Sequence, residues 1–99
     1  MNVLMVRAKI KEENIGDARA ATDKVIRALE QARPADVRYT VSVLNDGVTL
    51  VALLELQPDG GHPLASLPEY TELVENLKGW YAEPPIVDRM TVIGSYQLF

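Results

Sequence analysis

The segment from residue 37 to residue 56 constrains the fold most, because it has the pattern of two β-strands joined by a tight turn. Side chains alternate with a period of two over residues 37–44, as in a strand. Asn45, Asp46 and Gly47 follow, and these residue types tolerate the left-handed backbone that a tight hairpin requires. Residues 48–56 are apolar at both alternating sets of positions over most of their length. Such a strand is expected to be buried on both faces.

The flanking segments predict two more strands and two helices. Residues 2–11 alternate with the period of a strand, and the apolar positions of residues 15–32 form one helical stripe that Pro34 ends. A second helix is expected after Ser66, which forms a capping box with Glu69, and Gly79 is expected to follow its last turn. Residues 57–65 and 80–87 are expected to be loops, and residues 88–99 a fourth strand with a bulge or close approach at Gly94.

This order of elements, β-α-β-β-α-β, predicts an α+β fold of the ferredoxin-like kind. Both helices then cover one face of an antiparallel sheet. The whole chain, residues 1–99, forms a single domain by this interpretation, since its length suits one hydrophobic core.

Composition and charge exclude several classes of function. The formal net charge is −4 and no run of five or more basic residues occurs, so we expect no binding to nucleic acid or to anionic membranes. No apolar run is long enough to span a membrane and no signal peptide is recognisable, which predicts a cytoplasmic protein. The chain has no cysteine and one histidine, and no carboxylates cluster with that histidine, so we expect no metal site. Motifs for nucleotide cofactors, serine hydrolases and zinc hydrolases are absent from the sequence, and we expect no cofactor.

The sheet face that the helices leave open is expected to be partly apolar. It is predicted to hold Val3, Met5, Val51, Leu53 and Ile93, mixed with Arg7, Arg38, Thr40, Ser42, Glu55, Arg89 and Thr91. A contiguous apolar patch on a sheet usually marks an interface, so we expect a homodimer with the two sheets face to face. A partly buried Glu55 should then pair with Arg7 or Arg38. The alternative is a monomer with scattered surface aliphatic side chains.

The order of elements, the length and the two-sided third strand resemble the dimeric α+β barrel superfamily. Within it, the chain resembles the antibiotic biosynthesis monooxygenase group. The resemblance implies a sheet-to-sheet dimer with a pocket between sheet and helices. It also implies, as one possible activity, cofactor-free oxygenation of phenolic polyketides. The quinone-forming oxygenases carry an Asn and a Trp four residues apart near the second helix, and the stretch Asn76-Leu77-Lys78-Gly79-Trp80 has that spacing. The haem-degrading members carry an Asn on the first strand, then a Trp, then a His on the second helix. This chain does not fit that order, because His62 precedes Trp80 and lies before the helix.

Six residues are candidates for a functional site. Trp80, Asn76 and His62 are the catalytic candidates: an indole to stack on a flat ligand, an amide to bind a carbonyl, and a base that titrates near pH 7. Tyr70, Tyr81 and Arg38 are the candidates for substrate binding. Five of them have a structural alternative: core packing for Trp80 and Tyr70, a solvent-exposed position for His62 and Asn76, and ion pairing for Arg38.

Two functions follow. The first is a small dimeric monooxygenase-like enzyme that acts on an aromatic or polyketide-type small molecule without metal or prosthetic group. The second is a homodimer that binds a small ligand or has a structural role, without catalysis. The lack of any convergent acid–base pair in the sequence motivates the second.

Overall fold

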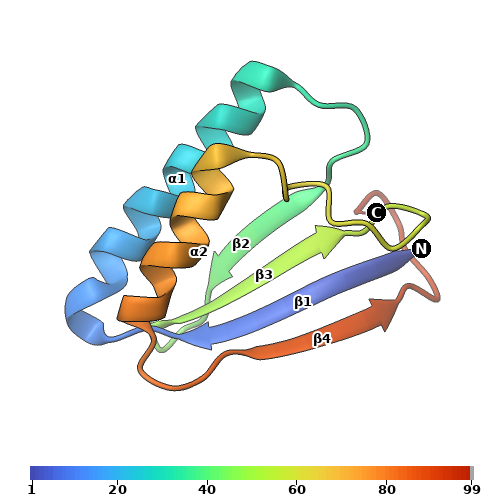
Figure 1. The fold of residues 1–99 in the computed structure, drawn as a ribbon. Helices are drawn as coiled ribbons and strands as arrows, with labels where there is room; N and C mark the ends of the chain where they lie inside the picture. The colour runs from blue at the N-terminus through green and yellow to red at the C-terminus, as the bar shows by residue number, and fades with distance from the viewer. Residues whose placement is uncertain (99) are drawn as a thin grey trace.

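A four-stranded antiparallel sheet with two helices on one face forms the fold, as the sequence predicts (Figure 1). The computed structural model describes residues 1–98. The strands are β1 (Asn2–Lys9), β2 (Tyr39–Val43), β3 (Thr49–Glu55) and β4 (Ile86–Thr91). The helices are the short 3-10 helix η1 (Glu12–Asn14), α1 (Ile15–Ala32) and α2 (Pro68–Trp80). The strand order is β2-β3-β1-β4, so the two most apolar strands lie in the middle of the sheet.

The core between sheet and helices consists of two apolar clusters. At one end Ala8, Ile10, Ala18 and Leu50 are buried together, with Leu77, Trp80 and Tyr81 packed against them. At the other end Leu54, Leu56 and Leu64 are buried, with Leu4, Leu29, Tyr39 and Tyr70 packed against them. Every second residue of β1 and β3 therefore faces the helices, and the residues between them face the open side of the sheet.

Asp46 organises the β2–β3 hairpin. Its carboxylate accepts hydrogen bonds from the backbone N–H groups of Val48 and Thr49 and from the hydroxyl of Thr49. Gly47 has a φ of +76°, the left-handed conformation expected of a hairpin residue. The Thr49 hydroxyl, followed by the two backbone N–H groups, lowers the pKa of Asp46.

Replacing Asp46 with alanine is expected to lower the melting temperature at pH 7. A carboxyl group whose pKa is lower in the folded state adds stability above its unfolded pKa, and this stability is lost as the pH falls through the folded pKa. The difference between the Asp46→Ala variant and the unaltered protein should therefore shrink on acidification. Thermal melts followed by circular dichroism from pH 7 to about pH 2 measure it. Asp46→Asn, which retains one acceptor oxygen, should lose less at pH 7, and a pH-independent difference would contradict this role.

The boundaries of α2 differ from the prediction at both ends. Ser66 does not cap the helix: Leu67 occupies the N-cap position without a side-chain hydrogen bond, and Pro68 begins the first turn. The helix also continues through Gly79 to Trp80. Packing of the Trp80 ring against the first core cluster offsets the helix cost of Gly79, which is about 1 kcal/mol.

The fourth strand was predicted over residues 88–99, and this prediction was wrong. β4 begins at Ile86 and ends at Thr91, because its ladder with β1 closes at the pair Asn2–Thr91 and β1 supplies no further partners. Gly94 therefore lies beyond the strand and marks no bulge in it. Phe99 lies outside the described residues.

The register of β4 also corrects the predicted open face. Arg89 lies opposite Leu4 and Thr91 opposite Asn2, so both are on the helix side of the sheet. Ile93 follows the strand and is fully exposed. The open face holds four of the predicted apolar residues: Val3, Met5, Val51 and Leu53. Met90 lies on the same face, opposite Val3.

Candidate functional site

The open face of the sheet contains the ion pair that the sequence predicts. Arg38 Nε lies 3.5 Å from Glu55 Oε2, and the Glu55 side chain is only 23% exposed. Tyr39, the next residue along the chain, packs on the helix side. Arg38 therefore lies across the sheet from the helices and is engaged by Glu55.

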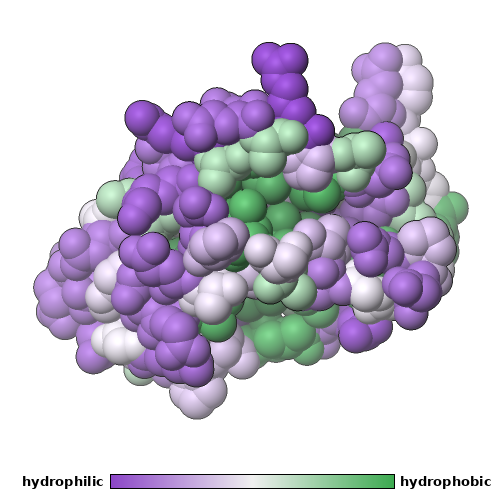
Figure 2. Space-filling model, turned by 45° about the horizontal axis from the view of Figure 1, so that its top comes forward, coloured by the Kyte–Doolittle hydropathy of each residue, from purple (hydrophilic) through white to green (hydrophobic). Residues whose placement is uncertain are grey.

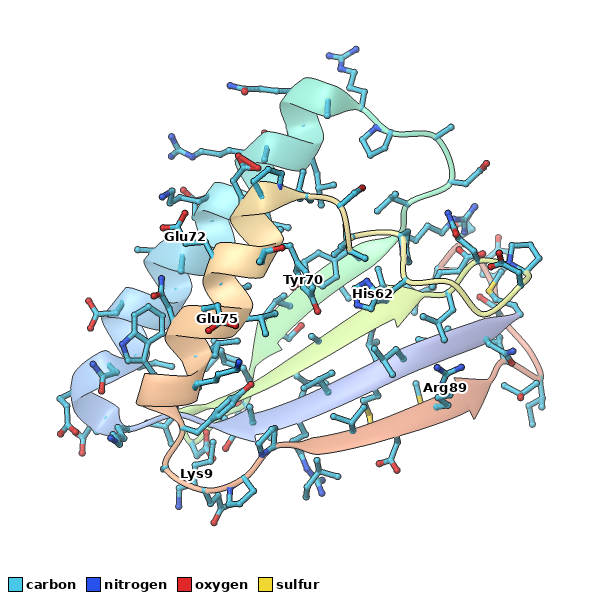
Figure 3. All side chains as sticks on the ribbon, in the orientation of Figure 1. Lys9, His62, Tyr70, Glu72, Glu75 and Arg89 are labelled. Carbon is cyan, nitrogen blue, oxygen red and sulfur yellow. The ribbon has the colours of Figure 1, made fainter. Side chains whose placement is uncertain are left out.

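On the helix side, the structure brings two of the predicted site residues into contact. His62, from the loop before α2, has its Nε2 3.2 Å from the Tyr70 hydroxyl oxygen, and the two ring centroids are 5.1 Å apart (Figure 3). The Nδ1 of His62 accepts a hydrogen bond from the backbone N–H of Leu64 at 3.2 Å. The ring of Tyr39 meets that of Tyr70 edge-on, with centroids 6.4 Å apart. Tyr39 was not among the predicted site residues, although its alternation with Val41 and Val43 places it on the helix side.

The loop that carries His62 is held at both ends. Near its start, the N–H of Gly60 donates to the carbonyl of Gln57, and the N–H of Gln57 donates to that of Gly61. Gly60 has a φ of +85°, a conformation that favours glycine. After His62, Leu64 is anchored in the second core cluster. The loop thus places the imidazole against α2.

The imidazole of His62 and the tyrosine hydroxyls around it are uncharged at neutral pH. Burial lowers the pKa of His62, which favours the neutral imidazole. Burial also raises the pKa of Tyr70, with a further contribution from Tyr81, and it raises the pKa of Tyr39 and Tyr81. The tyrosine hydroxyls therefore keep their protons and can donate hydrogen bonds.

A strip of the helix side next to this pair lies open. In Figure 1 the helices lie over the other strands and leave β4 uncovered. Val87 of β4 is 56% exposed, and Arg89 is exposed on the same side. The Arg89 guanidinium flanks the loop, because a Cβ on Gly60 would lie 3.9 Å from its Nη1. Arg89 has no ion-pair partner among residues 1–98. Figure 2, seen from the helix side, shows apolar side chains gathered in a central hollow ringed by hydrophilic groups.

Trp80 and Asn76 occupy a different part of α2. Trp80 is half-buried and packs against the first core cluster, and Asn76 is exposed. Asn76 lies six positions after Tyr70 in the helix, a rotation that leaves the two side chains about 120° apart around the helix axis. Tyr81 follows the helix and lies beside the first cluster. The structure thus joins His62 with Tyr70, and places Trp80 and Asn76 near the opposite end of α2. Tyr81 follows that end, but it interacts electrostatically with Tyr70 and lines the same interior cavity as Tyr39.

The enclosed space between sheet and helices is small. A cavity of about 50 Å³ lies between them, lined by Val6, Ala52, Tyr39, Leu73, Tyr81 and their neighbours. Pockets for drug-sized ligands hold about 300 Å³ or more. A ligand of that size therefore does not fit in this interior cavity.

Residues 1–98 contain no group of three or more His, Asp or Glu side chains placed to hold a metal ion. Within the same range, no helix has the length and apolar character needed to cross a membrane.

The fold is that of solved antibiotic biosynthesis monooxygenases, which confirms the fold expected from the resemblance. A structure titled antibiotic biosynthesis monooxygenase aligns with a TM-score of 0.75 at 16% identity, covering 95% of this chain and all of that one. A candidate antibiotic biosynthesis monooxygenase from Nitrosomonas europaea aligns with a TM-score of 0.78 at 16% identity and the same coverage. A mutant of SnoaB, a cofactor-independent oxygenase from Streptomyces nogalater, aligns at 0.71 and 12% identity over 97% of this chain and 96% of that one. No protein-family model and no curated protein match the sequence.

Proposed function

We propose that this protein is a small dimeric monooxygenase-like enzyme that acts on an aromatic or polyketide-type compound and uses neither metal nor prosthetic group. The observation that carries the proposal is the hydrogen-bonded pair of His62 and Tyr70, with Arg89, which has no ion-pair partner among residues 1–98, flanking the same loop at Gly60. The likeness in fold to a cofactor-independent oxygenase supports the same reaction class.

The reaction needs a substrate that supplies its own electrons. An anthrone, whose methylene group lies between two aromatic rings, is such a substrate. Loss of a proton gives an electron-rich anion that reduces O₂. One oxygen atom then becomes the new carbonyl oxygen, and the other leaves as water with the two methylene hydrogens. The products are a quinone and one water, so no external reductant is required.

The residues of the open strip suit the anion of such a substrate. The neutral Tyr70 hydroxyl can donate a hydrogen bond to the oxyanion, and the guanidinium of Arg89 can stabilise its charge. Val87 offers apolar surface to the flat rings. His62 helps to hold the Tyr70 hydroxyl in place through the hydrogen bond between them. Three of the other candidates lie away from this pair and stay as separate proposals, to be tested by their own variants: Trp80, Asn76 and Arg38. Tyr81, which interacts electrostatically with Tyr70, stays a proposed substrate-binding residue.

Dimerisation through the open face is part of the proposal. Met5, Val51, Leu53 and Met90 are only partly buried there, and Glu55 already has its partner in Arg38. An apolar patch whose partly buried carboxylate is paired suits a twofold interface between identical sheets.

Tyr70→Phe is expected to lower kcat/KM for oxygen consumption with 1,8-dihydroxyanthrone by about tenfold, the effect of one lost neutral hydrogen bond. The variant keeps the ring and its edge-on contact with Tyr39. An oxygen electrode measures the rate. Tyr96→Phe, the same change at a side chain that is exposed, is the matched control and should be unchanged. Equal rates in the unaltered protein and in Tyr70→Phe would remove Tyr70 from the site.

A ligand-binding protein without catalysis is the second candidate. The small interior cavity favours it, because a substrate on an open strip is not shielded from water. Stabilisation by hydroxyanthrones in thermal shift, together with no oxygen consumption by the unaltered protein, would establish this second function instead.

A further inference from the structure

We propose that His62 is a positioning residue for Tyr70: the imidazole carries its proton on Nε2, donates it to the Tyr70 oxygen, and so leaves the Tyr70 O–H directed at the ligand. The consequence for turnover rests on the proposed function, whereas the hydrogen-bond arrangement does not. In this arrangement His62 is not the base that its residue type suggests.

The Leu64 backbone fixes the protonation of the ring. A backbone N–H can only donate, so the Nδ1 that it meets at 3.2 Å must present a lone pair. A neutral imidazole holds one proton, which then lies on Nε2. That nitrogen points at the Tyr70 oxygen, 3.2 Å away, and is the donor in this bond.

The single hydroxyl proton of Tyr70 is therefore free for another acceptor. Tyr70 receives one hydrogen bond from His62, and this leaves its O–H to donate. The Arg89 guanidinium on the same strip also offers only donors. The site thus selects ligands that present an acceptor oxygen, such as a carbonyl or phenolate, and disfavours ligands that present only N–H donors.

Burial and the Leu64 bond oppose a second proton on the His62 ring, and a hydrogen bond with the residue's own backbone raises its pKa to a smaller extent. Protonation of Nδ1 would set two donors against each other and break the Leu64 bond. From α2 the ring faces the neutral Tyr70, and from β4 the cation Arg89 flanks its loop at Gly60. The carboxylate of Asp59 in the same loop accepts the N–H of Gly61. His62 has no carboxylate partner among residues 1–98.

The tautomer of His62 can be measured directly in the unaltered protein. The chain has one histidine, so the two nitrogen signals of its imidazole need no assignment. Long-range ¹⁵N–¹H correlation spectra at pH 7 to 8 should show the Nε2–H tautomer. An Nδ1–H tautomer, or a charged ring, would overturn the proposal. The reading does not depend on turnover.

Two substitutions separate the two bonds of the ring. His62→Gln can place its amide N–H near Nε2 and keep the bond to Tyr70, while it gives up the Leu64 bond. His62→Asn keeps an acceptor oxygen for Leu64 but is too short for Tyr70. With 1,8-dihydroxyanthrone, His62→Gln should stay within about threefold of the unaltered kcat/KM, and His62→Asn should fall about tenfold, to the level of Tyr70→Phe.

The double variant completes the test. His62→Asn combined with Tyr70→Phe should be no slower than Tyr70→Phe alone, because both changes remove the same oriented hydroxyl. Additive losses, or an unaltered rate in His62→Asn, would overturn the positioning role. An Nε2–H tautomer in a protein that consumes no oxygen would support the hydrogen-bond arrangement and overturn the proposed function instead.

Discussion

Replacing Leu64 with alanine is expected to lower the free energy of unfolding by about 2–5 kcal/mol, the usual cost of a Leu→Ala change in a packed core. Leu64 is 1% exposed and packs with Leu54 and Leu56. It is also the residue that anchors the His62 loop to the core. Urea unfolding followed by circular dichroism measures the loss, which should appear as a lower midpoint with little change in slope.

Leu44→Ala is the matched control for this prediction. The same atoms are removed at a side chain that is 45% exposed, and the expected loss is below about 1 kcal/mol. If Leu64→Ala costs no more than Leu44→Ala, Leu64 does not anchor the loop, and the placement of His62 against Tyr70 loses its support.

Replacing Leu53 with glutamate is expected to convert the proposed dimer into a monomer. Leu53 is partly buried in the middle of the open face, opposite Met5 on β1 and Thr40 on β2. In a twofold interface each copy would bury one unpaired carboxylate, at several kcal/mol apiece. The dissociation constant should therefore rise by more than about a thousandfold. Sedimentation at micromolar concentration should shift from twice the chain mass to the mass of one chain, 11.0 kDa.

Ala20→Glu adds the same charge on the exposed surface of α1 and should leave the sedimentation unchanged. Since the open face lies on the far side of the sheet from the helices, only Leu53→Glu touches the proposed interface. An unaltered protein that already sediments at 11.0 kDa would show that the open face is not an interface between copies.

Periodicity in the sequence was sufficient for most of the fold. The alternation of residues 37–56 fixed the hairpin, and the apolar stripe of residues 15–32 matches α1 (Ile15–Ala32). The wrong boundaries lie where a long-range partner decides. β4 ends because β1 ends, and α2 runs through Gly79 because Trp80 finds a packing site on the core. Neither partner is visible in the local pattern.

The candidate site was harder to predict, because its residues come from a loop, a helix and an edge strand. His62 and Tyr70 were both predicted as site residues. They lie eight positions apart in a loop and a helix, and no local period indicates that they are in contact. Arg89 was assigned to the open face because the alternation within the strand does not say which set of positions faces the helices, and only the register with β1 fixes this. The spacing of Asn76 and Trp80 indicates neighbours on one helix, and says nothing about which side of the helix faces a ligand.

The uncovered β4 also bears on how such a protein can change over generations. Val87 and Arg89 belong to neither core cluster, and the strand pairs with β1 alone. Substitutions at these two positions should alter which molecules are accepted at little expense in folding. A lineage with this architecture can therefore acquire new chemical preferences along one border while its interior stays as it is.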